Sequence, residues 1–300
     1  MEEGLSILIP VYNHVCLPLA TTLSRQIDGI GGAYACEVLF MDDGSNDERC
    51  KYANKGIRHF PHCQYVEQPV NVGRAMIRNT LAQEARYNHL LYLDCDVCVT
   101  NDHFIANWLE HLDDANVIVG SLTFDDGNGL YLHYLKYRYE RHYLSRHSVQ
   151  RRNMHPYKAF RTTHFMIRRE VMLKFPFDGS FHEYGYEDTL FGKILEENGI
   201  TLLHINDDVS IDNYEDNATF VRKTEESLRT LAAHAVQLEG YSSLLALYGV
   251  LHRWRVDSFV TAILTSTKSV MLRNIQGHHP SVFLFNIYKL YYFMSIVKDF

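Results

Sequence analysis

The sequence lacks several features that would place it in a specialised class of protein. No stretch is apolar over the roughly 18–20 residues that a membrane-spanning helix needs. Basic residues are not in excess: 29 Lys and Arg face 36 Asp and Glu, which argues against a general nucleic-acid binder. The opening residues Met1-Glu2-Glu3-Gly4 are acidic, so we expect no signal peptide. We therefore predict a cytoplasmic protein, either free or at the inner face of the membrane.

Cysteine is present, but not in a pattern that builds a metal or disulfide framework. All six cysteines lie between Cys16 and Cys98 at irregular gaps. Cys95 and Cys98 form a C-x-x-C pair with no second pair at zinc-finger spacing. We therefore expect reduced, mostly buried thiols.

The first two thirds of the chain alternate between short apolar runs and helical patterns. Such alternation predicts a mostly parallel sheet with helices on both faces. The expected strands are 5–13, 36–41, 64–68, 89–96, 117–124, 164–168 and 201–205; the main expected helices are 17–27, 74–85, 104–112, 131–143 and 189–197, and 207–217 is expected to be an acidic loop. From about residue 218 the pattern is helical. We predict a catalytic domain over 1–235 and a helical C-terminal extension over 236–300.

An acidic pair follows the strongest of these strands. Asp94 and Asp96 are one residue apart, so on an extended strand both side chains point to the same face. Two such carboxylates repel each other unless a cation lies between them, and Mg²⁺ or Mn²⁺ prefers oxygen ligands of this kind. The plainer alternative is a strand that runs into a polar turn.

Polar residues also follow the strands before this pair. Asn13 ends the first strand, and Asp42 and Asp43 end the second. Ligands of parallel α/β sheets bind at the carboxyl ends of the strands, so these residues predict one site. Asp42 or Asp43 could accept hydrogen bonds from a nucleobase or ribose, or could simply form a turn.

A third polar segment, Asn71-Val72-Gly73, stands at a helix entrance, where backbone N–H groups favour anions. Arg74 and Arg78 follow on one helical face and could hold a diphosphate or frame a base. Exposed surface arginines are the alternative.

Two acids begin a later helix. Glu187 and Asp188 follow Gly185 and Tyr186, next to a predicted helix start. Acids in this position often only complement the helix dipole. One of them could instead be a general base, and the dipole would favour its ionised form.

In this order and context, the motifs resemble glycosyltransferase family 2, whose members have the GT-A fold, invert the anomeric centre and use nucleotide sugars. The resemblance extends over about residues 5–231. The matching segments are Ile9–Asn13, Asp42–Ser45, Asn71–Gly73 with Arg78-Asn79, Asp94–Asp96 and Gly185–Asp188.

The resemblance implies a role for each matching residue. It implies Asp188 as catalytic base and Asp96 as metal ligand. The implied nucleotide-binding residues are Pro10, Tyr12, Asn13, Asp43, Asn71, Gly73, Arg78 and Asp94, and the implied acceptor- or sugar-binding residues are Gly185, Tyr186 and Glu187. The implied cofactor is Mn²⁺ or Mg²⁺.

The sequence departs from the family at one metal ligand. Related enzymes often offer a histidine in the loop before a helix like Lys223-Thr-Glu-Glu-Ser227, but here Ile211 holds its place. Asp212 or His204 would then substitute, or Asp96, phosphates and water would hold the metal alone. We take Asp212 as the predicted second ligand.

The predicted function is transfer of a sugar, of the hexosyl or N-acetylhexosaminyl type, from a UDP-sugar to an acceptor hydroxyl. The acceptor would be a carbohydrate or a lipid-linked molecule, in polysaccharide or glycoconjugate synthesis. Two alternatives stand beside it: a non-catalytic protein that binds nucleotide sugars, and a nucleotidyltransferase, although 11–14 is not the Gly-rich loop that the latter usually has after its first strand.

The C-terminal segment is rich in aromatic and aliphatic residues at 241–250, 259–272 and 283–297. Three roles fit such a surface: packing on the catalytic domain, formation of a homodimer, and peripheral docking on a membrane.

Overall fold

The computed structural model describes residues 2–124, 127–143, 148–211 and 214–297. The chain forms two compact units. Unit 1 comprises Met1–Thr123, Ser148–His182 and Phe191–Asp212; unit 2 comprises Phe124–His147, Glu183–Leu190 and Asn213–Phe300. The predicted domain boundary at residue 235 stays a prediction.

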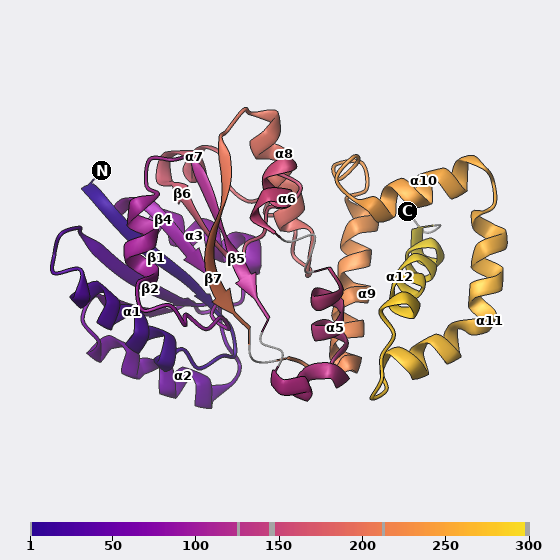
Figure 1. The fold of residues 1–300 in the computed structure, drawn as a ribbon, viewed down its shortest axis with the longest axis horizontal. Helices are drawn as coiled ribbons and strands as arrows, with labels where there is room; N and C mark the ends of the chain where they lie inside the picture. The colour runs from indigo at the N-terminus through magenta and orange to yellow at the C-terminus, as the bar shows by residue number, and fades with distance from the viewer. Residues whose placement is uncertain (1, 125–126, 144–147, 212–213, 298–300) are drawn as a thin grey trace. The chain divides into compact units, whose positions relative to one another are not determined.

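Unit 1 contains a seven-stranded sheet in the order β3-β2-β1-β4-β6-β5-β7 (Figure 1). The strands are β1 (Glu2–Val11), β2 (Cys36–Asp42), β3 (Cys63–Glu67), β4 (Tyr87–Leu93), β5 (Val117–Thr123), β6 (His164–Arg168) and β7 (Leu202–Ser210). Only β6 runs antiparallel to its neighbours, β4 and β5. The prediction of a mostly parallel sheet is therefore confirmed.

Helices cover both faces of this sheet (Figure 1). One face packs against α1 (Leu17–Gly29), η1 (Lys55–His59) and α4 (Phe104–Glu110). The other packs against α3 (Arg74–Glu84), α7 (Arg169–Lys174) and α8 (Glu187–Glu197) from Phe191 onward. Alternation along β1 explains the two cores, because Ile7 and Ile9 belong to the first and Leu8 to the second. Two short helices, α2 (Glu48–Asn54) and α6 (Val149–Met154), complete the unit.

The predicted acidic loop over 207–217 is wrong in its first part, because β7 continues to Ser210. The strand pairs in parallel with β5 as far as Thr123, across an irregularity between Val119 and Ser121. Asp207 is buried there and accepts a hydrogen bond from Asn107 at 3.2 Å. Long-range pairing thus overrides the local preference of an acidic segment for a loop.

Unit 2 is helical within the described residues. Its elements are η2 (Gly127–His133), α5 (Leu135–His142), α9 (Asn217–Ala233), α10 (Ser243–Arg253), α11 (Asp257–Ile275) and α12 (Val282–Ile296), together with the first residues of α8. The single helix expected over 131–143 is instead η2 followed by α5, and the helical C-terminal region is confirmed.

The apolar core of unit 2 includes Val221, Ile275, Phe285 and Tyr288. The side chain of Asn217 ties three segments together, since it accepts from the N–H of Leu135 at 2.6 Å and donates to the carbonyls of His133 and Gly277. Across the described chain, every helix is too short or too polar to cross a membrane.

Candidate active site

The predicted polar residues of unit 1 do meet at one edge of the sheet. β1 and β2 run in register from Leu5 opposite Cys36 to Val11 opposite Asp42, and β4 lies parallel on the other side of β1. The residues that follow these three strands therefore emerge at the same carboxyl edge, as the sequence predicted.

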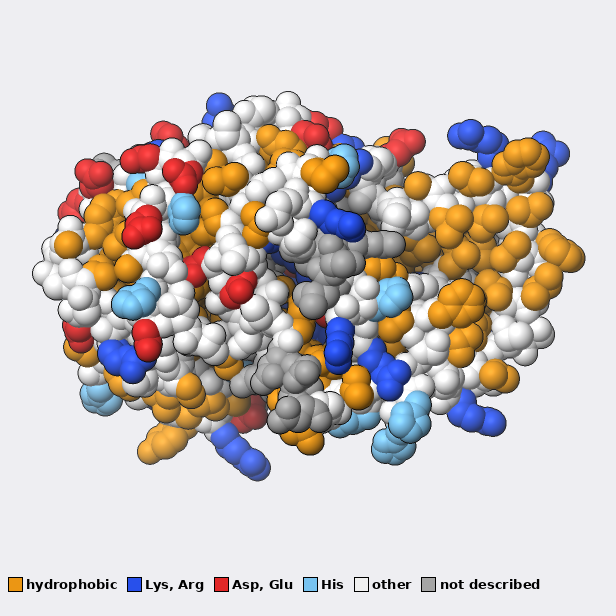
Figure 2. All heavy atoms as spheres, viewed as in Figure 1, with side chains coloured by type: hydrophobic (Ala, Val, Ile, Leu, Met, Phe, Trp, Pro, Cys, Tyr) orange, Lys and Arg blue, Asp and Glu red, His pale blue; other side chains and the backbone are white. Residues whose placement is uncertain are grey.

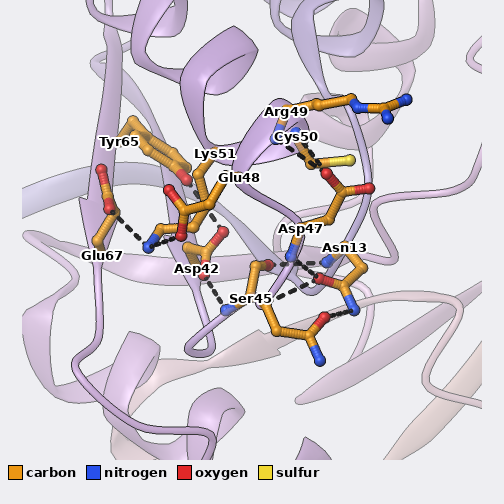
Figure 3. Close-up of polar contacts among 11 residues, drawn as sticks. Asn13, Asp42, Ser45, Asp47, Glu48, Arg49, Cys50, Lys51, Tyr65 and Glu67 are labelled. Atoms are coloured by element: carbon orange, nitrogen blue, oxygen red, sulfur yellow. Dashed lines mark hydrogen bonds and ion pairs between the residues drawn. The ribbon is translucent and has the colours of Figure 1, made fainter.

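Asn13 holds the loop after β1 to the loop after β2 (Figure 3). Its backbone N–H donates to Ser45 Oγ at 2.8 Å, and its Oδ1 accepts from the N–H groups of Asn46 and Asp47, both at 3.0 Å. Asp47 in turn caps α2 by accepting from the N–H of Arg49. Asn13 has a φ of +50°, a conformation that asparagine adopts more readily than most residues. Its side chain thus shapes the loop, and its contact with a nucleotide stays a prediction.

The adjacent acids Asp42 and Asp43 have different surroundings. Asp42 is fully buried and accepts from the N–H of Ser45 at 2.7 Å and from the hydroxyl of Tyr65 at 2.9 Å (Figure 3). It therefore supports the turn, one of the two roles that the sequence left open.

Asp43 accepts from the N–H groups of Val72 at 2.7 Å and Gly73 at 3.0 Å. Burial raises the pKa of its carboxyl group, while these two donors act in the opposite direction. Each oxygen of a carboxylate can accept a second hydrogen bond, so Asp43 keeps capacity toward a ligand. The contacts join the loop after β2 to the Asn71–Gly73 segment.

Gly44 permits the close approach of these two segments. Its φ is +63°, and a Cβ atom at this position would lie 2.5 Å from the backbone nitrogen of Asn71. Any larger residue would strain the backbone at position 44, and its side chain would collide with the backbone of Asn71. The glycine is thus required by the packing of one loop against the other.

Arg78 and Asp94 form a buried ion pair. The Arg78 guanidinium is 2% exposed and its Nη2 lies 2.8 Å from Asp94 Oδ1. Arg78 also donates to the carbonyl of Arg74 at 3.1 Å. Burial raises the pKa of the Asp94 carboxyl, and the charge of Arg78 opposes this effect. The structure therefore brings together two residues that the sequence predicted separately, and it excludes an exposed surface position for Arg78.

Asp96 differs from Asp94 in having its carboxylate uncommitted. It is half-buried, and its side chain makes no hydrogen bond or ion pair with any other residue that the structure describes. Mg²⁺ and Mn²⁺ are commonly held by one or two carboxylates together with substrate phosphates, so an acid pair of this kind fits such an ion.

The further metal ligand has no structural support. Within the described ranges, no three His, Cys, Asp or Glu residues are arranged to hold a metal ion. The predicted ligand Asp212 lies outside the described residues. His204 cannot substitute, because its Nε2 lies 2.9 Å from the carbonyl of Pro156 and its Nδ1 lies 3.1 Å from the Arg152 guanidinium.

The predicted catalytic segment, Gly185–Asp188, leads into α8 within unit 2. Gly185 has a φ of +97°, and a Cβ atom there would lie 2.6 Å from Ser227 Cβ on α9. Tyr186 also has a positive φ, +66°, which is unusual for an aromatic residue and marks local strain. Burial raises the pKa of its hydroxyl group.

Glu187 and Asp188 occupy the first turn of α8. Glu187 is buried, whereas Asp188 is half-buried and its Oδ1 accepts from the N–H of Thr189 at 2.7 Å. The N–H of Thr189 and the helix N-terminus thus place positive partial charge beside the Asp188 carboxylate.

The model of glycosyl transferase family 2 matches residues 6–175, more than half of the chain. The chain belongs to glycosyl transferase family 2.

Curated and solved relatives agree with this family. The chain is 31% identical to chondroitin synthase from Escherichia coli over 137 residues, which are 44% of this chain and 19% of that protein. The chain thus spans about a fifth of the length of this curated relative.

The solved structures are more distant in sequence and cover more of the chain. The mannosyltransferase PcManGT from Pyrobaculum calidifontis, in complex with GDP-Man and Mn²⁺, has a TM-score of 0.55 at 14% identity and covers 100% of this chain and 87% of its own. TarS from S. aureus, residues 1–349, has a TM-score of 0.50 at 14% identity, and the match covers 99% of this chain and 91% of that one. Glucosyl-3-phosphoglycerate synthase from Mycobacterium tuberculosis, in complex with Mn²⁺, UDP and glucosyl-3-phosphoglycerate, has a TM-score of 0.50 at 12% identity, and the match covers 77% of this chain and 79% of that one. These similarities show the GT-A fold.

One polar cluster of this family 2 chain was not foreseen from the sequence. Arg152 lies in a polar, basic stretch of the sequence, yet it is 7% exposed. Its guanidinium donates to the carbonyls of Gly120 and Ile205 and to Ser121 Oγ, and so links β5 to β7. Burial lowers the pKa of Arg152 to about 10. No local pattern distinguishes this arginine from its exposed neighbour Arg151, because its burial follows from the packing of α6.

Proposed function

We propose that this chain is an inverting glycosyltransferase that moves a sugar from a UDP-sugar to an acceptor hydroxyl. The observation that carries the proposal is the set of Asp43, Arg78, Asp94 and Asp96 at the carboxyl edge of the parallel strands of a family 2 domain. Two of the similar solved proteins are held in complexes with UDP and one with GDP-Man, and the two UDP complexes are the support for naming UDP.

Donor binding is assigned to unit 1. Asp43 would face the base with Pro10 and Tyr12, and Tyr12 is well exposed for this purpose at 46%. Asp94, held by Arg78, would accept from the ribose hydroxyls. Asn71 and Gly73 stand at the start of α3, and the positive end of a helix dipole favours the negative diphosphate.

Asp96 is the residue that would hold Mn²⁺ or Mg²⁺, with Asp212 as the predicted further ligand. When bound, the ion supplies a positive charge that stabilises the leaving diphosphate, an effect worth several kcal/mol.

Asp188 is assigned as the general base. It takes the proton of the acceptor hydroxyl while the oxygen forms a bond to the anomeric carbon. The bond from that carbon to the diphosphate breaks on the opposite face, and UDP leaves with the electron pair, which inverts the centre. Gly185, Tyr186 and Glu187 would position the acceptor or the sugar, and the strained backbone at Tyr186 supports a functional role for this segment.

The acceptor is proposed to be a carbohydrate or a lipid-linked molecule, in polysaccharide or glycoconjugate synthesis. The similarity to chondroitin synthase supports a carbohydrate acceptor and a sugar of the hexosyl or N-acetylhexosaminyl type. The proposed domain division is 1–235 for catalysis and 236–300 for the C-terminal extension, with a cytoplasmic location.

The test is release of nucleoside diphosphate from a panel of nucleotide sugars, each with Mn²⁺, Mg²⁺ or EDTA, for the wild type and Asp96→Ala. Metal-dependent release from a UDP-sugar by the wild type alone supports the proposal and names the sugar. UDP binding without release, in the presence of an acceptor panel, would favour a non-catalytic binding protein. Pyrophosphate release from a nucleoside triphosphate would favour a nucleotidyltransferase.

A further inference from the structure

Two helices of unit 2 carry apolar side chains on their exposed sides. On α10 these are Leu247, Val250 and the C-cap residue Trp254, spaced three and four residues apart and therefore on one helical face. On α11 they are Phe259, Ile263 and Val270, of which the first two are again four residues apart. We call these six residues the C-terminal apolar face. Figure 2 shows hydrophobic side chains gathered over α10 and α11.

The size of these side chains sets the face apart from ordinary surface. Trp254 is 74% exposed and Phe259 is 68% exposed. Single exposed apolar residues need no explanation, but a tryptophan, a phenylalanine and four aliphatic residues on two consecutive helices form a surface that normally meets a partner.

The charge of this segment is opposite to that of the whole chain. Residues 243–275 contain four basic residues, Arg253, Arg255, Lys268 and Arg273, and one acid, Asp257, although the chain as a whole has a net charge of −7. All four basic side chains are exposed, whereas the side chain of Asp257 is only 14% exposed and faces His252. Arg253 and Arg255 flank Trp254 directly.

The positive charge of this segment favours a partner with an anionic surface. Large apolar residues beside arginine and lysine are the pattern of helices that lie in the interface of an anionic bilayer. A symmetric contact between two copies would bring the same basic residues face to face, which costs free energy.

We propose that the C-terminal apolar face docks on the surface of an anionic lipid bilayer, with Trp254 and Phe259 entering the headgroup region and Arg253, Arg255 and Arg273 contacting lipid phosphates. This inference does not rest on the proposed transfer reaction, since it concerns lipid binding alone. Its failure would leave that reaction untouched.

The chain contains its own probe for this contact. Of its two tryptophans, Trp254 is exposed and Trp108 is fully buried in the core of unit 1. Full-length wild type is mixed with vesicles of phosphatidylcholine, with or without phosphatidylglycerol. We expect a blue shift of tryptophan emission only with phosphatidylglycerol, and quenching of the shifted component by brominated lipid. Unshifted, unquenched emission with anionic vesicles would overturn the proposal.

Variants test which residues are responsible. Arg253→Gln with Arg255→Gln is expected to lower vesicle partitioning about 30-fold, at about 1 kcal/mol per basic residue, and added NaCl should weaken wild-type binding. Phe259→Ser should abolish sedimentation with vesicles while leaving Trp254 in place. The matched controls Val236→Ser, 86% exposed outside this face, and Arg151→Gln should bind like wild type.

Size-exclusion chromatography separates docking from self-association. A dimer that Phe259→Ser converts to a monomer, together with no vesicle binding by wild type, would show that the face joins two copies and would refute the proposal. Circular dichroism confirms that each variant is folded, and the wild-type fluorescence result stands even if one variant is not.

Discussion

At the scale of single residues, the candidate site separates side chains that shape the loops from side chains left for a ligand. Asn13 and Asp42 direct their polar atoms into neighbouring loops, whereas Asp96 has no partner among the described residues. Arg78 has a role of both kinds, because its ion pair stabilises the fold and also holds the candidate site residue Asp94 at the edge of the sheet. Substitutions should therefore divide into those that change catalysis and those that change folding.

Replacement of Asp188 by asparagine should change catalysis alone. The amide keeps the shape of the side chain but cannot take a proton, so the turnover number should fall by about 10²–10⁴-fold. UDP affinity, measured by calorimetry, should stay within about twofold, because Asp188 is assigned to the acceptor and not to the nucleotide. Glu196→Gln makes the same chemical change on an exposed part of α8 and should leave the rate unaltered. A fully active Asp188→Asn variant would exclude the assigned base.

Replacement of Arg78 by methionine should change stability. The variant leaves Asp94 partly buried without its counter-charge, and breaking a buried pair in this way costs about 3–5 kcal/mol. Because the Asp94 side chain is 25% exposed, we expect the lower end of this range, measured by urea unfolding. Arg25→Met breaks the exposed pair with Asp102, 69% and 78% exposed, and should cost less than about 1 kcal/mol. Equal losses in the free energy of unfolding for the two variants would show that burial of the Arg78–Asp94 pair does not increase its effect on stability.

At the scale of elements, the site depends on two loops that approach each other at backbone distance. The loop after β2 and the Asn71–Gly73 segment are joined by Asp43 and kept compact by Gly44. Because Asp43 links these two irregular loops and their backbones are in contact at Gly44, a small displacement of one loop should move the other.

Gly44→Ala tests this coupling. The added methyl group meets the Asn71 nitrogen and the carbonyl carbon of Val70 at 2.5 and 2.6 Å, so the loops must separate. Gly199→Ala is the matched control, because Gly199 has nearly the same φ, +64° against +63°, with nothing within 4 Å of its Cβ position. Both variants carry the backbone strain of about 1–3 kcal/mol, but only Gly44→Ala should also weaken UDP binding. Unchanged UDP affinity in Gly44→Ala would separate these loops from the nucleotide site.

At the scale of the whole molecule, buried titratable groups link folding to pH. Burial lowers the pKa of both His164 and His204 to about 4. The folded chain therefore keeps both rings neutral as pH falls below the unfolded value of about 6.5, while the unfolded chain takes up protons. The stability that they contribute is complete above about pH 6.5 and is lost as pH falls toward 4.

His204→Gln should flatten this dependence. Near pH 5 each histidine should steepen the fall in the free energy of unfolding by about 1 kcal/mol per pH unit. The raised pKa values of Asp207 and Asp208 act in the opposite direction, so the comparison of variant with wild type isolates the histidine. Urea titrations at several pH values measure the slopes, and parallel slopes for the two proteins would contradict a neutral buried His204.

The sequence by itself determined the class of fold and the position of the candidate site. Apolar runs of strand length alternating with helical patterns predict a mostly parallel sheet, and the carboxyl ends of its parallel strands share one edge. Asp43, Asp94 and Asp96 could therefore be assigned to that edge from local pattern alone. Glu187 and Asp188 at a helix start are local in the same sense.

Only the tertiary structure decided what each polar group contacts. That Asp42 supports a turn while its neighbour Asp43 joins a second loop depends on Tyr65 and Val72, which lie more than twenty residues away along the chain. The extension of β7 to Ser210 depends on pairing with β5, and the burial of Arg152 and His204 depends on the packing of α6 against the sheet. Local patterns carry information about backbone periodicity, whereas burial and hydrogen bonding are set by residues distant in the sequence, so their partners emerge only when the chain is folded.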